Sequence, residues 1–111
     1  MDVLTAKYSN DEDTLSVLLS GEIDHHSART VREEIDLKID EIKPKKLVLD
    51  LSKIGFMDSS GLGLMLGRYT KMKSLGGTLT VLNPTRGAER VLRLAAADKI
   101  IPIERTEESS K

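Results

Sequence analysis

The sequence has few of the residues that metal binding, disulfide formation and base stacking require. It has no cysteine and no tryptophan, and its aromatic residues are Tyr8, Phe56 and Tyr69. The lack of cysteine excludes disulfides and thiolate metal sites, and so few aromatic side chains cannot form a surface that stacks nucleic-acid bases. No apolar run is long enough for a signal peptide or a membrane span. We therefore expect a soluble, cytoplasmic protein without a membrane partner.

The sequence also lacks an excess of charge of either sign. The chain carries 17 Lys and Arg against 18 Asp and Glu, a net charge of -1. Such a mixture creates no one-signed field that would attract nucleic acid, so we expect no direct nucleic-acid contact. A length of 111 residues with 39% hydrophobic content supports one core but not two, which predicts a single domain over residues 1–111.

Hydrophobic periodicity predicts two opening strands and then an alternation of helices and strands. Residues 46–51 form a nearly continuous apolar run, which is typical of a central strand buried on both faces. The other expected strands cover residues 3–8, 15–19, 78–82 and 100–103, with Gly21 closing the second and residues 105–111 left as a frayed tail. Helices are expected between Asp24 and Pro44, over residues 59–75, and around Ala88, Val91, Leu92 and Ala95. This order predicts an α/β fold with a mixed sheet of four or five strands, covered by helices.

The segment 56–69 places two serines at the start of the second helix. Asp58 or Ser59 is the expected N-cap, because either side-chain oxygen can accept a free amide of the first turn. Ser59 and Ser60 then lie in that turn, where the positive end of the helix dipole favours anionic groups. Taken alone, the pair fits either simple capping or a site that carries an anion.

Gly63 and Gly67 interrupt this helix, although glycine in a helix interior costs about 1 kcal/mol relative to alanine. On a helical projection both lie near Ser60, with Leu64 adjoining them as a small apolar anchor. They point away from the predicted core stripe, which consists of Leu62, Met65, Leu66, Tyr69 and Met72. The strip fits either the close approach of a partner or packing by the third helix. A solvated face is expected for the basic residues Arg68, Lys71 and Lys73.

Asp24, His25 and His26 stand at the predicted start of the first helix, with Asp24 as its N-cap. Adjacent side chains on a helix point about 100° apart, so the two histidines cannot easily share one ion, and no third ligand is clustered with them. We expect no metal and no cofactor. The histidines either contact a partner or form a solvated first turn.

Catalytic signatures are missing around Ser59. No Gly-x-Ser-x-Gly elbow surrounds it, and Asp24 beside His25 competes for a capping role instead of completing a triad. Gly61-Leu62-Gly63 is too short for a dinucleotide fingerprint and lacks the lysine of a phosphate loop. We expect no catalytic residues and no enzyme activity.

Three segments together resemble the anti-sigma factor antagonist family, whose fold is the STAS domain. They are GEIDHHSA at 21–28, FMDSSGLG at 56–63 and LGRY at 66–69, and they occur in the family's order across nearly the whole chain. The DSSGLG run with the upstream DHH is closest to the sporulation-type antagonists. One departure is that the short, polar segment 106–111 does not resemble the helix that often follows the last strand in this family.

The resemblance implies that Ser59, directly after the aspartate, is phosphorylated by a serine kinase that is also the anti-sigma factor and holds ATP or ADP. Unphosphorylated protein would bind this kinase and free the sigma factor, and a serine phosphatase would reset the cycle. The expected partner-binding residues are Asp24, His25, Asp58, Ser60, Gly61, Leu62, Gly63, Leu64 and Gly67. The alternative is a non-catalytic STAS scaffold module of a stress-signalling assembly.

Overall fold

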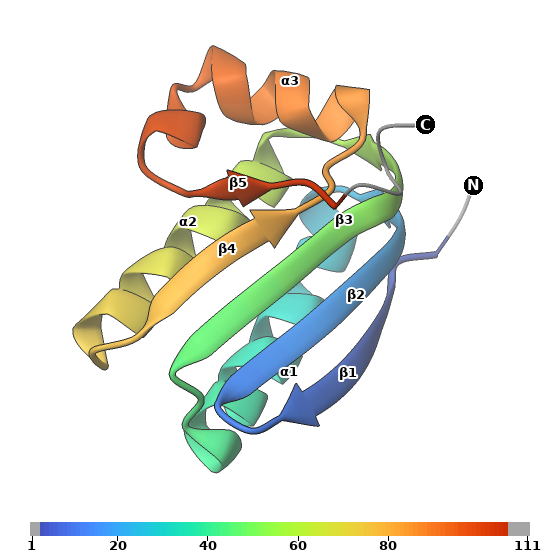
Figure 1. The fold of residues 1–111 in the computed structure, drawn as a ribbon. Helices are drawn as coiled ribbons and strands as arrows, with labels where there is room; N and C mark the ends of the chain where they lie inside the picture. The colour runs from blue at the N-terminus through green and yellow to red at the C-terminus, as the bar shows by residue number, and fades with distance from the viewer. Residues whose placement is uncertain (1–2, 107–111) are drawn as a thin grey trace.

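Five strands form one sheet in which neighbours in sequence are neighbours in space (Figure 1). The structure is a computed structural model that describes residues 3–106. Its strands are β1 (Thr5–Asp11), β2 (Thr14–Ile23), β3 (Lys46–Met57), β4 (Thr78–Leu82) and β5 (Ile103–Glu104). β1 is antiparallel to β2, whereas the pairs from β2 to β5 are all parallel. The predicted mixed α/β sheet is therefore confirmed.

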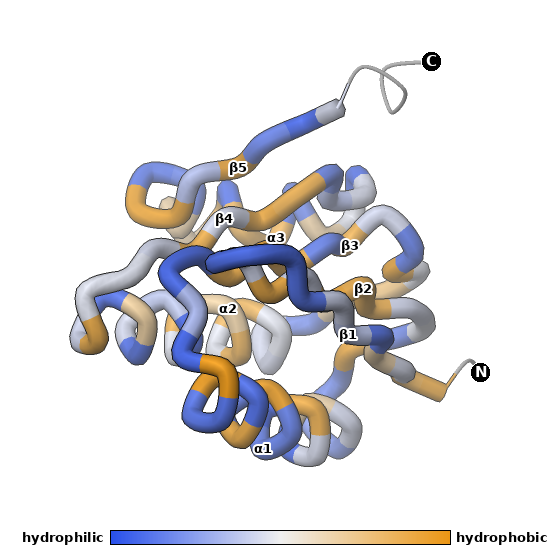
Figure 2. The backbone as a smooth tube through the Cα atoms, turned by 60° about the horizontal axis from the view of Figure 1, so that its bottom comes forward, coloured by the Kyte–Doolittle hydropathy of each residue, from blue (hydrophilic) through white to orange (hydrophobic). Residues whose placement is uncertain are grey.

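Helices cover the sheet on the face where its strands are most apolar. They are α1 (His25–Ile42), α2 (Ser59–Ser74), α3 (Arg86–Leu94) and the short 3-10 helix η1 (Ala97–Lys99). Figure 1 shows α1 and α2 side by side behind the strands, and in Figure 2 α1 alternates hydrophobic and hydrophilic segments along its length. That alternation is typical of a helix with one buried face. The strand side of the core includes Leu15, Val17, Leu19, Ile23, Leu47, Leu49, Leu51, Ile54, Met57, Leu79 and Val81.

Both central strands run further than their sequence pattern predicts. β2 continues past Gly21 to Ile23, so the prediction that Gly21 closes the strand is wrong. Gly21 has a φ of +108°, and a Cβ there would lie 2.4 Å from the carbonyl oxygen of Val3. The pairing of β2 with β3 shifts register on both sides of this residue, as at a β-bulge. The shift disturbs the two-residue period of burial. For this reason the sequence pattern predicts a strand only over residues 46–51, whereas β3 continues to Met57.

The last strand is shorter than predicted. Within the predicted run 100–103, only Ile103 belongs to β5, which pairs with β4. Pro102 has no N–H for the ladder, but its carbonyl accepts a hydrogen bond from the Val81 N–H at 2.9 Å. The strand pairing of β5 with β4 therefore begins at Ile103, directly after the proline.

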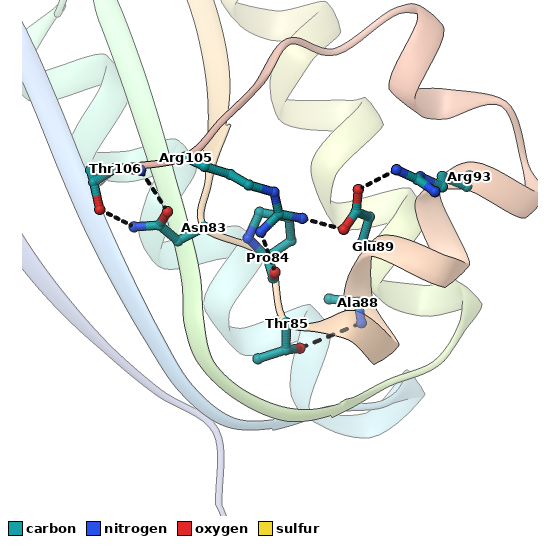
Figure 3. Close-up of polar contacts among 8 residues, drawn as sticks. All are labelled: Asn83, Pro84, Thr85, Ala88, Glu89, Arg93, Arg105 and Thr106. Carbon is teal, nitrogen blue, oxygen red and sulfur yellow. Dashed lines mark hydrogen bonds and ion pairs between the residues drawn. The ribbon is translucent and has the colours of Figure 1, made fainter. Parts of the chain in front are cut away.

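Two residues that we predicted in a frayed tail are held in place (Figure 3). The Thr106 N–H donates to Asn83 Oδ1 at 2.9 Å, and Arg105 donates to the Pro84 carbonyl at 3.2 Å. Arg105 also pairs with Glu89 of α3. These contacts fasten the chain after β5 to the connection between β4 and α3. The rest of the predicted tail, and the question of a terminal helix, fall on residues 107–111, outside the described residues.

Two ion pairs join α1 to α2. Arg68 Nε lies 2.9 Å from Asp36 Oδ1, and Lys71 Nζ lies 3.0 Å from Asp40 Oδ1. The Arg68 side chain is only 9% exposed, so the predicted solvated face is wrong at this residue. Burial lowers the pKa of Arg68; Asp36 opposes this shift, and the positive charge of Arg32 adds to it.

The buried face of α2 is therefore rotated relative to the predicted stripe. The helix buries Gly61, Leu64, Met65, Arg68 and Met72. The other predicted core residues, Leu62, Leu66 and Tyr69, are only partly buried. An arginine can occupy the core side because α1 supplies its carboxylate.

We predict that Asp36→Ala lowers the free energy of unfolding by about 2 kcal/mol, because it leaves a buried guanidinium without its carboxylate. Asp40→Ala is the matched control and should cost less than about 1 kcal/mol, since that carboxylate is mostly exposed. Urea denaturation followed by circular dichroism measures both. Equal losses for the two variants would contradict the importance of the Arg68 pair.

Candidate functional site

Two helices begin side by side at the carboxyl ends of the parallel strands β2 and β3. The last pair in their register is Ile23 with Met57, and the next residue of each strand is an aspartate. The Asp58 N–H donates to the Ile23 carbonyl at 3.1 Å, which extends the strand pairing to the start of α2. The starts of α1 and α2 therefore lie together at one end of the sheet.

Asp24 caps α1 through a reciprocal pair of hydrogen bonds. One carboxylate oxygen accepts from the N–H groups of His26 at 3.0 Å and Ser27 at 2.8 Å. In return, Ser27 Oγ accepts from the Asp24 N–H at 3.1 Å, which completes a capping box. Hydrogen bonds from Ser27, first its backbone and then its side chain, lower the pKa of Asp24 below the ordinary value of 3.8.

Asp58, and not Ser59, caps α2. Its Oδ1 accepts from the Ser60 N–H at 2.7 Å. Ser59 is the first residue of the helix and is exposed, and among residues 3–106 its hydroxyl has no hydrogen-bond partner. The structure thus decides between the two predicted caps and leaves the Ser59 oxygen accessible.

The predicted partner-binding residues of α2 divide between surface and core. Gly61 and Leu64 are buried, and a Cβ at Gly61 would lie 2.2 Å from Met57 Cγ, so Gly61 serves close packing. Leu64 is only 3% exposed, which corrects its expected place on the outward strip. Gly63 and Gly67 do face outward, because a Cβ at either would meet nothing within 4 Å. The alternative in which the third helix packs on this strip is therefore wrong.

A groove of about 380 Å³ lies between the first halves of α1 and α2. Its lining residues are His25, Ala28, Arg29, Arg32, Ser60, Gly63 and Leu64. The groove places His25 beside Ser60 and Gly63 of α2, whereas the exposed His26 is not among the lining residues. Sequence reasoning missed Arg29 and Arg32, although both lie beside the apolar stripe of α1 at a spacing that places them on one face.

Sequence reasoning also missed Phe56. It lies near the end of β3, opposite Glu22 of β2, and is 52% exposed. An exposed aromatic residue two positions before Asp58 is a candidate anchor for a partner. Strand alternation gave no signal for it, because Ile54 two residues earlier is buried and the register shift opposite Gly21 breaks the two-residue period before Phe56.

The described residues contain neither a metal-binding cluster nor a membrane-spanning helix. No group of three or more His, Cys, Asp or Glu side chains in residues 3–106 is arranged to hold a metal ion. None of the helices described there combines the length and the apolar character that crossing a membrane needs.

Comparison with known proteins identifies the family. The model of the STAS domain matches residues 6–110. The chain belongs to the STAS domain family. An anti-sigma F factor antagonist of Paenibacillus polymyxa is 42% identical over 89 residues, which cover 80% of this chain and 76% of the relative. An anti-sigma F factor antagonist of Lysinibacillus sphaericus is 32% identical over 83 residues, 75% of this STAS domain and 71% of the relative.

Solved structures give the same assignment. The unphosphorylated form of the anti-sigma factor antagonist SpoIIAA matches with a TM-score of 0.79 and 27% identity, covering 96% of this STAS domain and 92% of the other chain. The phosphorylated form of the Bacillus cell fate determinant SpoIIAA matches with a TM-score of 0.73 and 27% identity, covering 96% of both. The resemblance seen in the sequence is confirmed.

The lowered pKa of Asp24 predicts a pH-dependent cap. Its carboxylate contributes to folding fully above the unfolded-state pKa of about 4, and this contribution is lost as the pH falls through the lower folded-state pKa. Asp24→Asn keeps a capping oxygen without the charge. Urea denaturation should therefore give the wild type a higher free energy of unfolding than this variant. The difference should be the same at neutral and mildly acidic pH and should shrink below about pH 4. A difference independent of pH would contradict the electrostatic origin of the cap.

Proposed function

We propose that this STAS domain is an anti-sigma factor antagonist that is switched by phosphorylation of Ser59. In its unphosphorylated form it binds an anti-sigma factor kinase, with the ATP or ADP of that kinase, and releases the sigma factor. The observation that carries the proposal is the exposed Ser59 hydroxyl, free of hydrogen bonds within the described residues because Asp58 caps the helix. The names of the relatives support the partner, since two are antagonists of anti-sigma F factors.

The first turn of α2 can carry a phosphate without unfolding. A phosphoserine adds about -1.5 to -2 charge at neutral pH. Asp58 repels this charge, but the positive end of the helix dipole offsets part of the repulsion. Because the Ser59 hydroxyl makes no hydrogen bond within the described residues, its modification costs the fold no cap. The dianion instead changes the surface that a partner meets.

The remaining parts of the cycle follow from this switch. A serine phosphatase returns Ser59 to its free form, and the domain itself contributes no catalysis, no metal and no cofactor. The cycle operates in the cytoplasm, where sigma factors act, and does not involve direct contact with nucleic acid. The candidate surface comprises the exposed or half-exposed residues around Ser59, namely Asp24, His25, Asp58, Ser60, Leu62, Gly63 and Gly67.

Binding to the anti-sigma F factor of Paenibacillus polymyxa tests the switch. Ser59→Ala should bind as the wild type does, because Asp58 keeps the cap. Ser59→Asp should bind more weakly, but phosphoserine should weaken binding most, since one carboxylate carries less charge and fewer acceptor oxygens than a phosphate. Calorimetric titration compares these forms, and Ser60→Ala is tested with and without phosphate because its binding should still be switched by phosphorylation of Ser59. Equal affinity of the phosphorylated and free proteins would remove the switch, and self-association without partner binding would favour a scaffold.

Gly63 provides a second, steric test of the same surface. Gly63→Leu should preserve the fold, because a Cβ at this position meets nothing within 4 Å, yet it should weaken partner binding by filling the smooth strip. Gly87→Leu on α3 is the matched control, since its Cβ also meets nothing within 4 Å. Thermal melts check folding, and calorimetry checks binding. If both variants bind equally well, a partner does not approach the strip closely.

A further inference from the structure

The groove between α1 and α2 carries positive charge that the described part of the protein does not balance. Arg29 Nε lies 3.9 Å from Glu33 Oε2, and both side chains are mostly exposed, so this pair is weak. Arg32 forms no ion pair within residues 3–106. The nearby Asp36 is already paired with Arg68 at 2.9 Å. Two guanidinium groups therefore line the groove with little compensation.

The shape of the groove lets another chain reach these guanidinium groups. Its α2 wall contains Ser60 and Gly63, and beyond Gly63 there is open space where a side chain would otherwise stand. The groove holds about 380 Å³, which is enough for one or two side chains of a docked segment. Arginine presents a rigid fork of donors that fits a carboxylate in two parallel hydrogen bonds. The fitting ligand is thus an aspartate or glutamate side chain.

We propose that an acidic segment of the anti-sigma factor docks in this groove, with a carboxylate between Arg29 and Arg32. The proposal rests on the function proposed above and names the chemistry that its partner presents. It also gives a second physical reason why phosphorylation would weaken binding. Ser59 directly precedes the groove residue Ser60, so a phosphate there would add negative charge beside the groove and weaken the attraction of the arginines for the acidic segment.

Charge reversal in the groove tests the proposal. The purified anti-sigma F factor of Paenibacillus polymyxa is titrated into wild type, Arg29→Glu, Arg32→Glu and Arg90→Glu. The last variant is the control, because it makes the same charge change at an exposed position of α3. We expect each groove variant to weaken binding by about tenfold or more and to reduce its dependence on salt, while the control stays within about twofold of the wild type. Circular dichroism melts verify that each variant is folded.

The outcomes separate the groove from the switch. If the wild type binds and Ser59→Asp weakens binding, but the groove variants bind as the wild type does, the acidic docking segment is overturned and the proposed function stands. An equal loss in Arg90→Glu would show an effect of net charge and would also overturn the groove. If the wild type does not bind the factor at all, the proposed function fails and the groove proposal fails with it.

Discussion

The pairing of β2 with β3 up to their last residues is the constraint on which the candidate site depends. Ile23 and Met57 end the two strands at the same level, and the Asp58 N–H closes the pairing on the Ile23 carbonyl. Because the strands are parallel, both of the following helices begin at this edge. The bulge at Gly21 lets β2 reach it, since a side chain there would collide with the Val3 carbonyl. Without this pairing, the two capping aspartates would belong to separate surfaces.

The two caps use serine in opposite ways. At α1, Ser27 completes the capping box with Asp24 and its hydroxyl also donates to the Glu22 carbonyl at 3.2 Å, so this serine belongs to the fold. At α2, Asp58 alone supplies the cap and the neighbouring Ser59 is left exposed. A group that is not used by the fold can be modified at little cost in stability. This division of roles is what makes a surface switch at Ser59 physically reasonable.

The sequence predicts the order of elements and the caps, because both depend on local patterns. Asp24 is the predicted N-cap of α1, and Asp58 is one of the two residues predicted to cap α2. The first helix ends at Ile42, with Lys43 as its C-cap before Pro44, as local rules expect. The orientation of α2 was not predictable, because Arg68 is buried only through Asp36, which lies on another helix. The groove was missed for the same reason. Arg29 and Arg32 line it only because α2 lies beside α1, which the pattern of α1 alone does not show.

The central claim is that the anti-sigma factor phosphorylates one particular serine, and peptide mass spectrometry tests it most directly. The protein, Ser59→Ala and Ser60→Ala are each incubated with ATP and the anti-sigma F factor of Paenibacillus polymyxa. A switch at Ser59 requires one phosphate per chain in the wild type and in Ser60→Ala, and none in Ser59→Ala. Phosphate on Ser60, or an unmodified wild type, would contradict it.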